Sequence, residues 1–311
     1  MRLVMKRCGT ILALLSADPT RERRCQVLSL VSNSQEDPDD QHTPGQLLGD
    51  VAPMTATVAW ITYAPVKGLA LTHADEVGLD LTGVRENRRF HLVTAEGRLV
   101  NGKVAGSLVQ VGAVADRDGT HLSLHFPDGS TVGGEVALGA AIETDFWGRP
   151  VAARLVEGDF SSALSAFVGR PLRLLRVNEP GDGSDRGVDG SVSIVSNGTL
   201  DRLAREAGQE RVDGRRFRML FGIEGVGEHV EETWVGGQVA IGDAVIRLRE
   251  LVGRCAVTTQ DPDTGVPDLD TLRVLARYRS DVESEEPLPI GVWGGVEQPG
   301  TVRVGDPVSP L

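Results

Sequence analysis

Short stretches in which apolar and polar residues alternate recur along most of the chain after residue 55. In HLSLHFPDGSTVGGEV, the residues Leu122, Leu124 and Phe126 share one face, PDG supplies a turn, and Val132 restarts the alternation. A period of two on both sides of a turn predicts a β-hairpin. RRFHLVTAEGRLVNG and GGQVAIGDAVIRLREL predict two further hairpins, around AEG and GD. The pattern therefore predicts a chain built mainly of short strands.

Helical spacing occurs in three places. These are SSALSAFVG, capped by Ser161 or Ser162, NGTLDRLAREAG, ended by Gly208, and DLDTLRVLARYR, capped near Asp270. Many strands, few helices and 38 glycines favour barrels or sandwiches over a doubly wound α/β sheet. We expect a mainly β protein with a few helices, made of two β-barrel-like modules that meet near Pro150.

The first 55 residues differ from the rest. MRLVMKRCGTILALLSADP resembles a signal peptide weakly, because its apolar run is interrupted and no small-residue cleavage site follows. SNSQEDPDDQHTPGQ is too polar to offset the entropy of ordering. Since the alternating pattern begins abruptly after Met54, we hypothesise that the native chain starts there. We therefore expect residues 1–55 to be a disordered or mis-called extension, followed by modules at 56–150 and 151–311.

Composition narrows the function classes. A length of 311 residues is enough for two ordinary domains. The net charge of −12 argues against nucleic-acid binding, which needs a basic face. Three cysteines without framework spacing fit a reducing compartment, and no apolar run approaches the ~18 residues of a membrane span. We expect a cytoplasmic protein that binds neither nucleic acid nor membrane.

Several familiar motifs fail on physical grounds. The glycine-rich GDGSDRG leads into the strand-like SVSIVS, so it offers no helix N-terminus to a phosphate and is expected to be a mobile loop. DPDTG is not a calcium loop, because proline is second and Leu272 stands where the bidentate glutamate belongs. The histidines show no zinc-ligand spacing.

Cys255 carries the strongest chemical signal. It lies between Arg254 and a β-branched run, and the polar TTQDPDTG follows. A neighbouring arginine favours the thiolate, which is the form that binds metals or attacks electrophiles. The residues alone leave three interpretations open: a metal ligand, a nucleophile, or an inert core cysteine.

These residues resemble a known family, the MOSC-domain proteins, and within it the amidoxime-reducing component type. GRCAVTTQDPDTGV, LRVLARYR and EQPGTVRVGDPV resemble its C-terminal signature in order and spacing. YAPVKGL and ENRRFHLVTAEGRLV resemble its N-terminal β-barrel module, so that the resemblance covers about residues 56–311. It implies an N-terminal β-barrel domain followed by a MOSC β-barrel domain.

The resemblance also implies a molybdenum cofactor, whose metal is held by a pterin dithiolene and one protein cysteine. Cys255 matches that ligand, and Arg254 would keep its thiolate charged. Lys67 matches a phosphate-contacting lysine, and it is one of only three lysines in the chain. Arg89 and Arg218 match arginines that approach the cofactor.

The chain departs from the family pattern in two places. Met219 and Leu220 stand where proline and asparagine are usual, which puts the identity of the substrate in doubt. Ser196 is retained as a cofactor-binding candidate, whereas Asn197 replaces a common glutamate. No cysteine cluster for an iron–sulfur centre follows, so electrons would come from a separate iron–sulfur or flavin protein.

The resemblance thus implies an oxidoreductase that reduces small N-hydroxylated substrates by two electrons. Asp261 is expected to relay a proton or to cap its turn. A second hypothesis is a sulfur or cofactor carrier that uses a Cys255 persulfide, and a third is a hydrolase with Cys255 as nucleophile. Descriptions of the family sometimes include pyridoxal phosphate, but a Schiff base would need Lys67 or Lys103.

Overall fold

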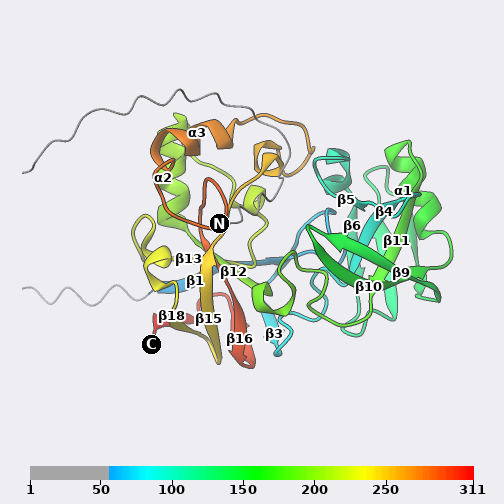
Figure 1. The fold of residues 1–311 in the computed structure, drawn as a ribbon, viewed down its shortest axis with the longest axis horizontal. Helices are drawn as coiled ribbons and strands as arrows, with labels where there is room; N and C mark the ends of the chain where they lie inside the picture. Colours follow the sequence, from blue (N-terminus) through cyan, green and yellow to red (C-terminus); the bar gives the residue numbers. More distant parts are fainter. Residues whose placement is uncertain (1–55) are drawn as a thin grey trace, which may run out of the picture. The chain divides into compact units, whose positions relative to one another are not determined.

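The computed structural model describes residues 56–311, and the expectations for residues 1–55 lie outside them. The described residues form many short strands and three α-helices, which confirms the mainly β class (Figure 1). Within this range no helix is long and apolar enough to cross a membrane.

Seven strands close into a barrel, because the first strand of the chain pairs with β13 as well as with β18. Alternation in that strand buries Ala56, Val58 and Ile61 in the barrel core. An antiparallel pair of strands distant in sequence, β3 (Glu76–Leu79) with β17 (Gly300–Arg303), adds to this core. In order around the barrel, the strands are β13 (Phe221–Glu224), β12 (Val192–Ser196), β16 (Val292–Gln298), β15 (Ala244–Leu251), β14 (Gln238–Ile241), β18 (Pro307–Pro310) and β1 (Ala56–Tyr63), with β2 (Thr72–Ala74) beside β1.

The second module consists, among the described residues, of two separate sheets. Leu122 and Leu124 of β7 are buried against α1 (Phe160–Val168) and the larger sheet, while His121 and His125 face outward. The predicted hairpins at 121–135 and 90–100 are both confirmed. The sheets are β5 (Leu99–Val100), β4 (Phe90–Thr94), β11 (Leu172–Val177), β10 (Arg149–Val156) and β9 (Leu138–Phe146), and then β6 (Gly112–Ala115), β7 (His121–His125) and β8 (Thr131–Glu135).

The boundary expected near Pro150 does not separate the two modules. It falls inside the β9–β10 hairpin, and β10 pairs in turn with β11. The barrel also takes its first strands from residues 56–79. The sequence pattern marks where strands begin and end, but it does not show which distant strands pair, so the interleaving of the modules was not predicted.

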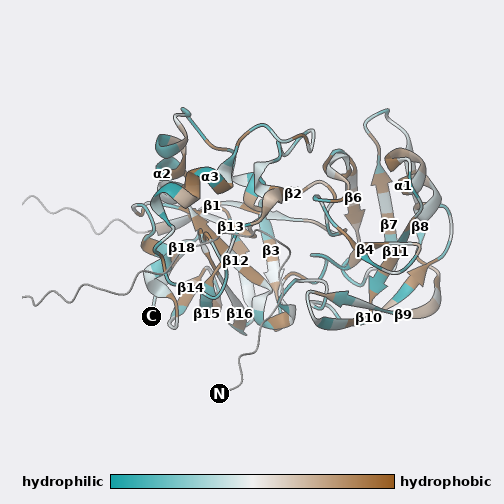
Figure 2. Ribbon diagram, turned by 45° about the horizontal axis from the view of Figure 1, so that its top comes forward, coloured by the Kyte–Doolittle hydropathy of each residue, from teal (hydrophilic) through white to brown (hydrophobic). Residues whose placement is uncertain are grey.

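Helices α2 (Asn197–Ala207) and α3 (Thr271–Tyr278) lie side by side, and both carry hydrophobic and hydrophilic residues in turn (Figures 1 and 2). Their apolar faces cover a core cluster that includes Leu203 and Leu275. The predicted end of α2 at Gly208 (φ 65°) and start of α3 at Asp270 are confirmed. In α1 the N-cap is Asp159, two or three residues before the predicted Ser161 or Ser162.

Candidate functional site

Cys255 lies in an extended segment between β15 and a 3₁₀ turn, Ala256–Thr259, and its side chain is exposed. Its carbonyl oxygen accepts hydrogen bonds from the backbone N–H and the hydroxyl of Thr258, both at 3.0 Å. The Thr258 hydroxyl lies 2.7 Å from that of Thr271, the first residue of α3. The backbone of Cys255 is therefore fixed, through Thr258, to the start of α3, while its thiol remains accessible.

Arg254 is buried and faces the interior. Its guanidinium donates to the carbonyl oxygens of Phe217 (3.1 Å) and Ile290, and to the sulfur of Met219 (3.1 Å). Burial lowers the pKa of Arg254 to about 9, and Cys255 opposes that change. Arg254 is thus charged at neutral pH and electrostatically close to Cys255, but its N–H groups are used on other partners.

Lys67 follows β1 and is 7% exposed. Its ammonium nitrogen lies 2.8 Å from Oδ1 of Asp185 and donates to the carbonyl oxygen of Gly183 at 3.2 Å. The ring of Phe146 lies 5.1 Å away, a distance at which a cation is attracted to the ring face. The indole N–H of Trp147 donates to the same Asp185 oxygen at 3.0 Å. The lysine is thus held from three sides.

Arg88 and Arg218 complete a group that we call the cation cluster, Lys67, Arg88 and Arg218. Arg88 donates to the carbonyl oxygen of Arg218 (3.3 Å), and Arg218 donates to that of Leu69 (2.7 Å). Both arginines have positive φ, 53° and 51°, which costs a non-glycine residue about 1 kcal/mol or more. Burial, and then Arg88, lower the pKa of Arg218 to about 10. Strained backbone and like charges coincide here, as is common at functional sites.

The segment Phe217–Met219 connects Cys255 to the cation cluster. Arg254, the neighbour of Cys255, donates to Phe217 and Met219, the residues on both sides of Arg218. The side chain of Arg218 then reaches the Lys67 loop through Leu69. The structure therefore brings together four of the predicted site residues: Cys255, Arg254, Arg218 and Lys67.

Arg89 is not brought to this group. Both of its terminal nitrogens lie 3.3 Å from the carbonyl oxygen of Asn178, and Gly119 packs against its side chain. Burial and the nearby Arg176 lower its pKa. The left-handed backbone of Arg88 (φ 53°), in the turn before β4, lets Arg88 take the place expected for Arg89.

Ser196 is fully buried and caps α2. Its hydroxyl oxygen accepts from the backbone N–H of Thr199 at 3.0 Å and donates to the Thr199 hydroxyl at 2.9 Å. Its backbone N–H donates to the buried Glu231. These bonds occupy the side chain in starting the helix, and they leave no observed contact with the cation cluster.

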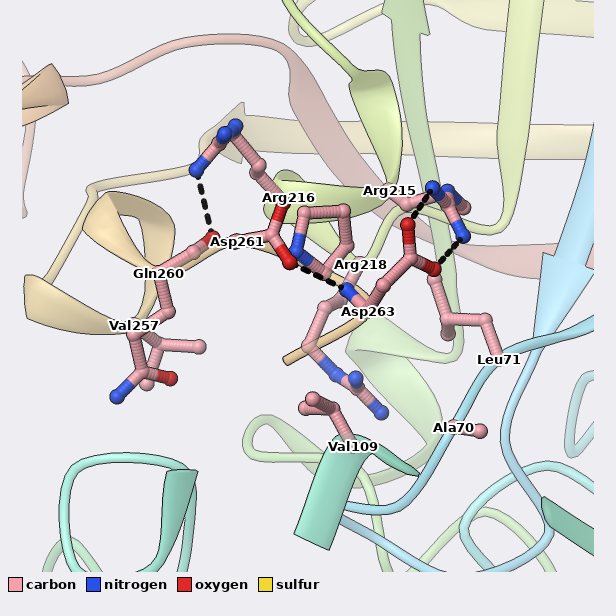
Figure 3. Close-up of a pocket in the computed structure, with 11 residues that line it drawn as sticks. Ala70, Leu71, Val109, Arg215, Arg216, Arg218, Val257, Gln260, Asp261 and Asp263 are labelled. Atoms are coloured by element: carbon pink, nitrogen blue, oxygen red, sulfur yellow. Dashed lines mark hydrogen bonds and ion pairs between the residues drawn. The ribbon is translucent and has the colours of Figure 1, made fainter. Parts of the chain in front are cut away.

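Asp261 lies at the edge of a pocket of about 80 Å³ (Figure 3). Its Oδ1 accepts from the backbone N–H groups of Asp263 (3.1 Å) and Thr264 (2.8 Å), and from the Thr264 hydroxyl (2.9 Å). The Thr264 bonds are the largest cause of its lowered pKa. The pocket is lined by Ala70, Leu71, Val109, Arg215, Arg216, Arg218, Val257, Gln260, Asp261, Pro262 and Asp263.

Within residues 56–311, two of the three arginines that line this pocket are paired with carboxylates, and the third is not. Arg215 forms ion pairs with Asp213 and Asp263, and Arg216 pairs with Asp268. Arg218 has no ion pair with any residue between 56 and 311. The pocket therefore has an apolar wall and one arginine without a carboxylate partner.

Sequence reasoning missed Arg88, Asp185 and Trp147. The sequence identified GDGSDRG as a glycine-rich loop. The residues around Asp185 give no sign, however, that its carboxylate pairs with Lys67, which lies 118 positions earlier. The loop was expected to be mobile, yet Lys67 and Arg149 bond to its carbonyl oxygens. The doublet Arg88-Arg89 was noticed, and the backbone conformation alone decides which member faces the cluster.

The sequence matches one family model and several individual proteins. Residues 181–309 match the family model described as "MOSC domain". Mitochondrial amidoxime-reducing component 1 of Mus musculus is 38% identical over 121 residues, which is 37% of this chain and 35% of that relative. The human protein of the same name is 28% identical over 280 residues, 81% of this chain and 82% of that one.

A solved structure, the YuaD protein from Bacillus subtilis, covers 82% of this chain and 94% of its own at 14% identity and a TM-score of 0.42. Residues 181–309, the part of the chain that matches the MOSC domain, contain the barrel strands β12 to β16 and the exposed Cys255. The match to the human amidoxime-reducing component extends over 81% of this chain, whereas the match to the mouse relative spans about a third of that protein.

The residues present fit a molybdenum cofactor, which carries an anionic phosphate and supplies sulfur ligands of its own. The cation cluster brings three cations together against one carboxylate, Asp185, and so has excess positive charge. Residues 56–311 contain no group of three or more His, Cys, Asp or Glu side chains that could hold a metal ion. A metal bound through the soft thiolate of Cys255 would thus need its remaining ligands from a cofactor.

Proposed function

We propose that the protein is a molybdenum-cofactor-dependent oxidoreductase that reduces small N-hydroxylated compounds. The observation that carries the proposal is the exposed Cys255, joined through Phe217–Met219 to a cluster of cations. The MOSC domain and the similarity to amidoxime-reducing components support it.

Each residue of the site has a defined task in this proposal. Cys255 provides the thiolate ligand, and Lys67, Arg88 and Arg218 hold the phosphate and pterin. The bound cofactor would supply a centre that exchanges two electrons and accepts oxygen. Arg254 fixes the main chain before Cys255, because it bonds to Phe217 and Ile290.

The pocket beside Arg218 is where we place the substrate. Leu71, Val109 and Val257 provide an apolar wall, and Arg218 can donate to an oxygen of the substrate. The overall reaction is R–C(=NOH)NH2 + 2e⁻ + 2H⁺ → R–C(=NH)NH2 + H2O. The lowered pKa of Asp261 keeps its carboxylate ionised at neutral pH, so its bonds favour the turn-capping role over proton donation.

Electrons would come from a separate iron–sulfur or flavin protein, and this partner and the cytoplasmic location stay predictions. Pyridoxal phosphate is disfavoured, because Lys67 is buried and paired with Asp185 and Lys103 lies over the Trp147 ring. The alternative, a carrier of sulfur on Cys255, is favoured only by the exposure of that thiol.

The test uses full-length protein purified from a host that makes the cofactor, with a chemical electron donor in place of the protein partner. We expect conversion of benzamidoxime to benzamidine by the wild type, none by Cys255→Ala, and undiminished turnover by the surface control Asp189→Asn. Molybdenum-loaded protein that does not turn over, together with cyanide-releasable sulfur on Cys255, would favour the carrier instead.

A further inference from the structure

We propose that Asp185 is the positioning residue of Lys67: its carboxylate holds the ammonium group beside Arg88 and Arg218 and balances part of their charge, so that the cation cluster can bind an anionic group. The inference rests on the proposed anion-binding role of Lys67. It assigns a role to a residue that does not itself hold the cofactor in the proposed function. It also predicts how the affinity for phosphate depends on pH.

The geometry places Asp185 where it can act in this way. The Lys67 nitrogen lies 2.8 Å from Oδ1 of Asp185, and the carbonyl oxygen of Gly183 in the same loop takes a second bond. The loop packs closely against Arg88, because a Cβ at Gly183 would collide with the carbonyl oxygen of Arg88. Arg149 donates to the carbonyl oxygens of Asp182 (2.6 Å) and Ser184.

Trp147 provides an independent reason to assign Asp185 a task. Its side chain is 63% exposed, on a residue with φ of 58°, so neither hydrophobic burial nor backbone preference explains its position. The indole N–H of Trp147 donates a hydrogen bond to Oδ1 of Asp185. The hydrogen bond holds the carboxylate between the lysine and the β9–β10 turn.

The groups that surround Lys67 come from four parts of the described structure: the 181–187 loop, the residues before and within β4, the segment that contains Arg218, and β9. Among residues 56–311, Asp185 from the 181–187 loop is the one anion, whereas Arg88 before β4 and Arg218 after the 3₁₀ turn Gly214–Phe217 are cations. His91 in β4 is also close, but burial lowers its pKa to about 3, and it is neutral. Phe146 in β9 presents only its ring.

The balance of these groups decides whether Lys67 is charged. The pKa of Lys67 is lowered to about 8: burial lowers it most, Asp185 opposes this, and Arg88 and Arg218 add to the lowering. An opposite charge at this distance contributes roughly 1 to 3 pKa units. The Asp185 side chain is 42% exposed, so we take the lower end of that range. Without Asp185, Lys67 would therefore lose its proton near neutral pH.

The titration of Lys67 can be followed directly by NMR with lysine labelled at the ε-carbon, because the chain has only three lysines. We expect the wild-type Lys67 signal to titrate near 8 and the Asp185→Asn signal about one unit lower. Asp185→Glu should restore most of the difference. The matched control is Asp189→Asn, which removes an exposed carboxylate paired with Arg249.

Binding of inorganic phosphate, measured by calorimetry, tests the consequence. The ratio of the Asp185→Asn dissociation constant to that of the wild type should rise about threefold between pH 6 and 7.5, because the charged fraction of Lys67 falls much further in the variant than in the wild type. The titration of phosphate itself cancels in this ratio. A purely structural role for Asp185 would change affinity by the same factor at both pH values.

An unchanged Lys67 titration in Asp185→Asn, or a ratio that does not vary with pH, would overturn the inference. If that variant does not fold, Trp147→Phe replaces it: a smaller fall in the Lys67 pKa is expected, and no fall would overturn the inference. Neither measurement needs molybdenum, so metal-free protein would contradict the proposed function and leave this result standing.

Discussion

Arg254 shows how a residue next to the candidate ligand can act without touching it. Its buried guanidinium satisfies carbonyl oxygens of two segments distant in sequence, Phe217 and Ile290. A planar fork with five N–H groups suits this task, and an ammonium cannot reproduce it.

We therefore expect Arg254→Lys to lower the free energy of unfolding by about 2 to 4 kcal/mol, because buried carbonyl groups lose their donors. Urea unfolding followed by circular dichroism measures this loss. The control is Arg249→Lys, at an exposed ion pair. A change below about 1 kcal/mol, as for an exposed pair, would contradict the assigned bonds.

Asp261 offers a second prediction for a single residue. In Asp261→Asn the amide oxygen can still accept the bonds from Asp263 and Thr264, so stability should change by less than about 1 kcal/mol. If the side chain only holds the turn, reductase turnover should persist as well. A drop in turnover of a hundredfold or more would instead identify Asp261 as a proton relay.

Which residues of the site could be predicted depended on whether their signal was local. Motifs in their own segments predicted Cys255, Lys67 and Arg218. Asp185 was missed because its importance arises only when the 181–187 loop meets Lys67. Arg89 was chosen over Arg88 because sequence does not report the positive φ of Arg88.

At the level of elements, local signals predicted well. The hairpin turns and the ends of α2 and α3 were read correctly, because turn residues, a capping aspartate and a left-handed glycine act over a few positions. α1 begins earlier than predicted because Asp159 takes the N-cap position, without a side-chain bond.

The N-cap of α2 yields a prediction that separates two roles of Ser196. Ser196→Ala removes the acceptor for the Thr199 N–H and leaves a buried hydroxyl short of a partner, so stability should fall by about 1 to 2 kcal/mol. The molybdenum content of the folded variant should equal that of the wild type. Loss of metal from a variant that still folds would assign Ser196 to the cofactor after all.

At the scale of the whole molecule, the mainly β class followed from alternation, but the arrangement of modules did not. The chain enters the barrel with β1, leaves it to build the second module, and returns at β12. Strand pairs such as β1–β13 and β4–β11 join residues far apart in sequence, and no local pattern encodes them. A boundary near Pro150 was expected because it divides the predicted strands into two consecutive groups, each of which could form one module.

His91 makes the stability of the second module depend on pH. It is fully buried beside Phe146 and Thr144, and burial lowers its pKa to about 3. The unfolded chain binds this proton near pH 6.5, so the contribution of His91 is complete above 6.5 and is lost as pH falls toward 3.

Between pH 6.5 and 5 this residue alone should cost about 2 kcal/mol of unfolding free energy. In His91→Gln, which can keep a bond to Thr144, that part of the decline should disappear. Urea unfolding at the two pH values, for both proteins, measures the difference. Equal declines would show that His91 carries a proton in the folded state.

The central claim, that Cys255 holds the metal of a bound molybdenum cofactor, is tested most directly by elemental analysis. Wild type, Cys255→Ala and Asp189→Asn are purified from a host that makes the cofactor, and molybdenum is counted per chain. We predict nearly one molybdenum in the wild type and in Asp189→Asn, and almost none in Cys255→Ala. Wild-type protein without molybdenum, or equal metal in Cys255→Ala, would contradict the claim.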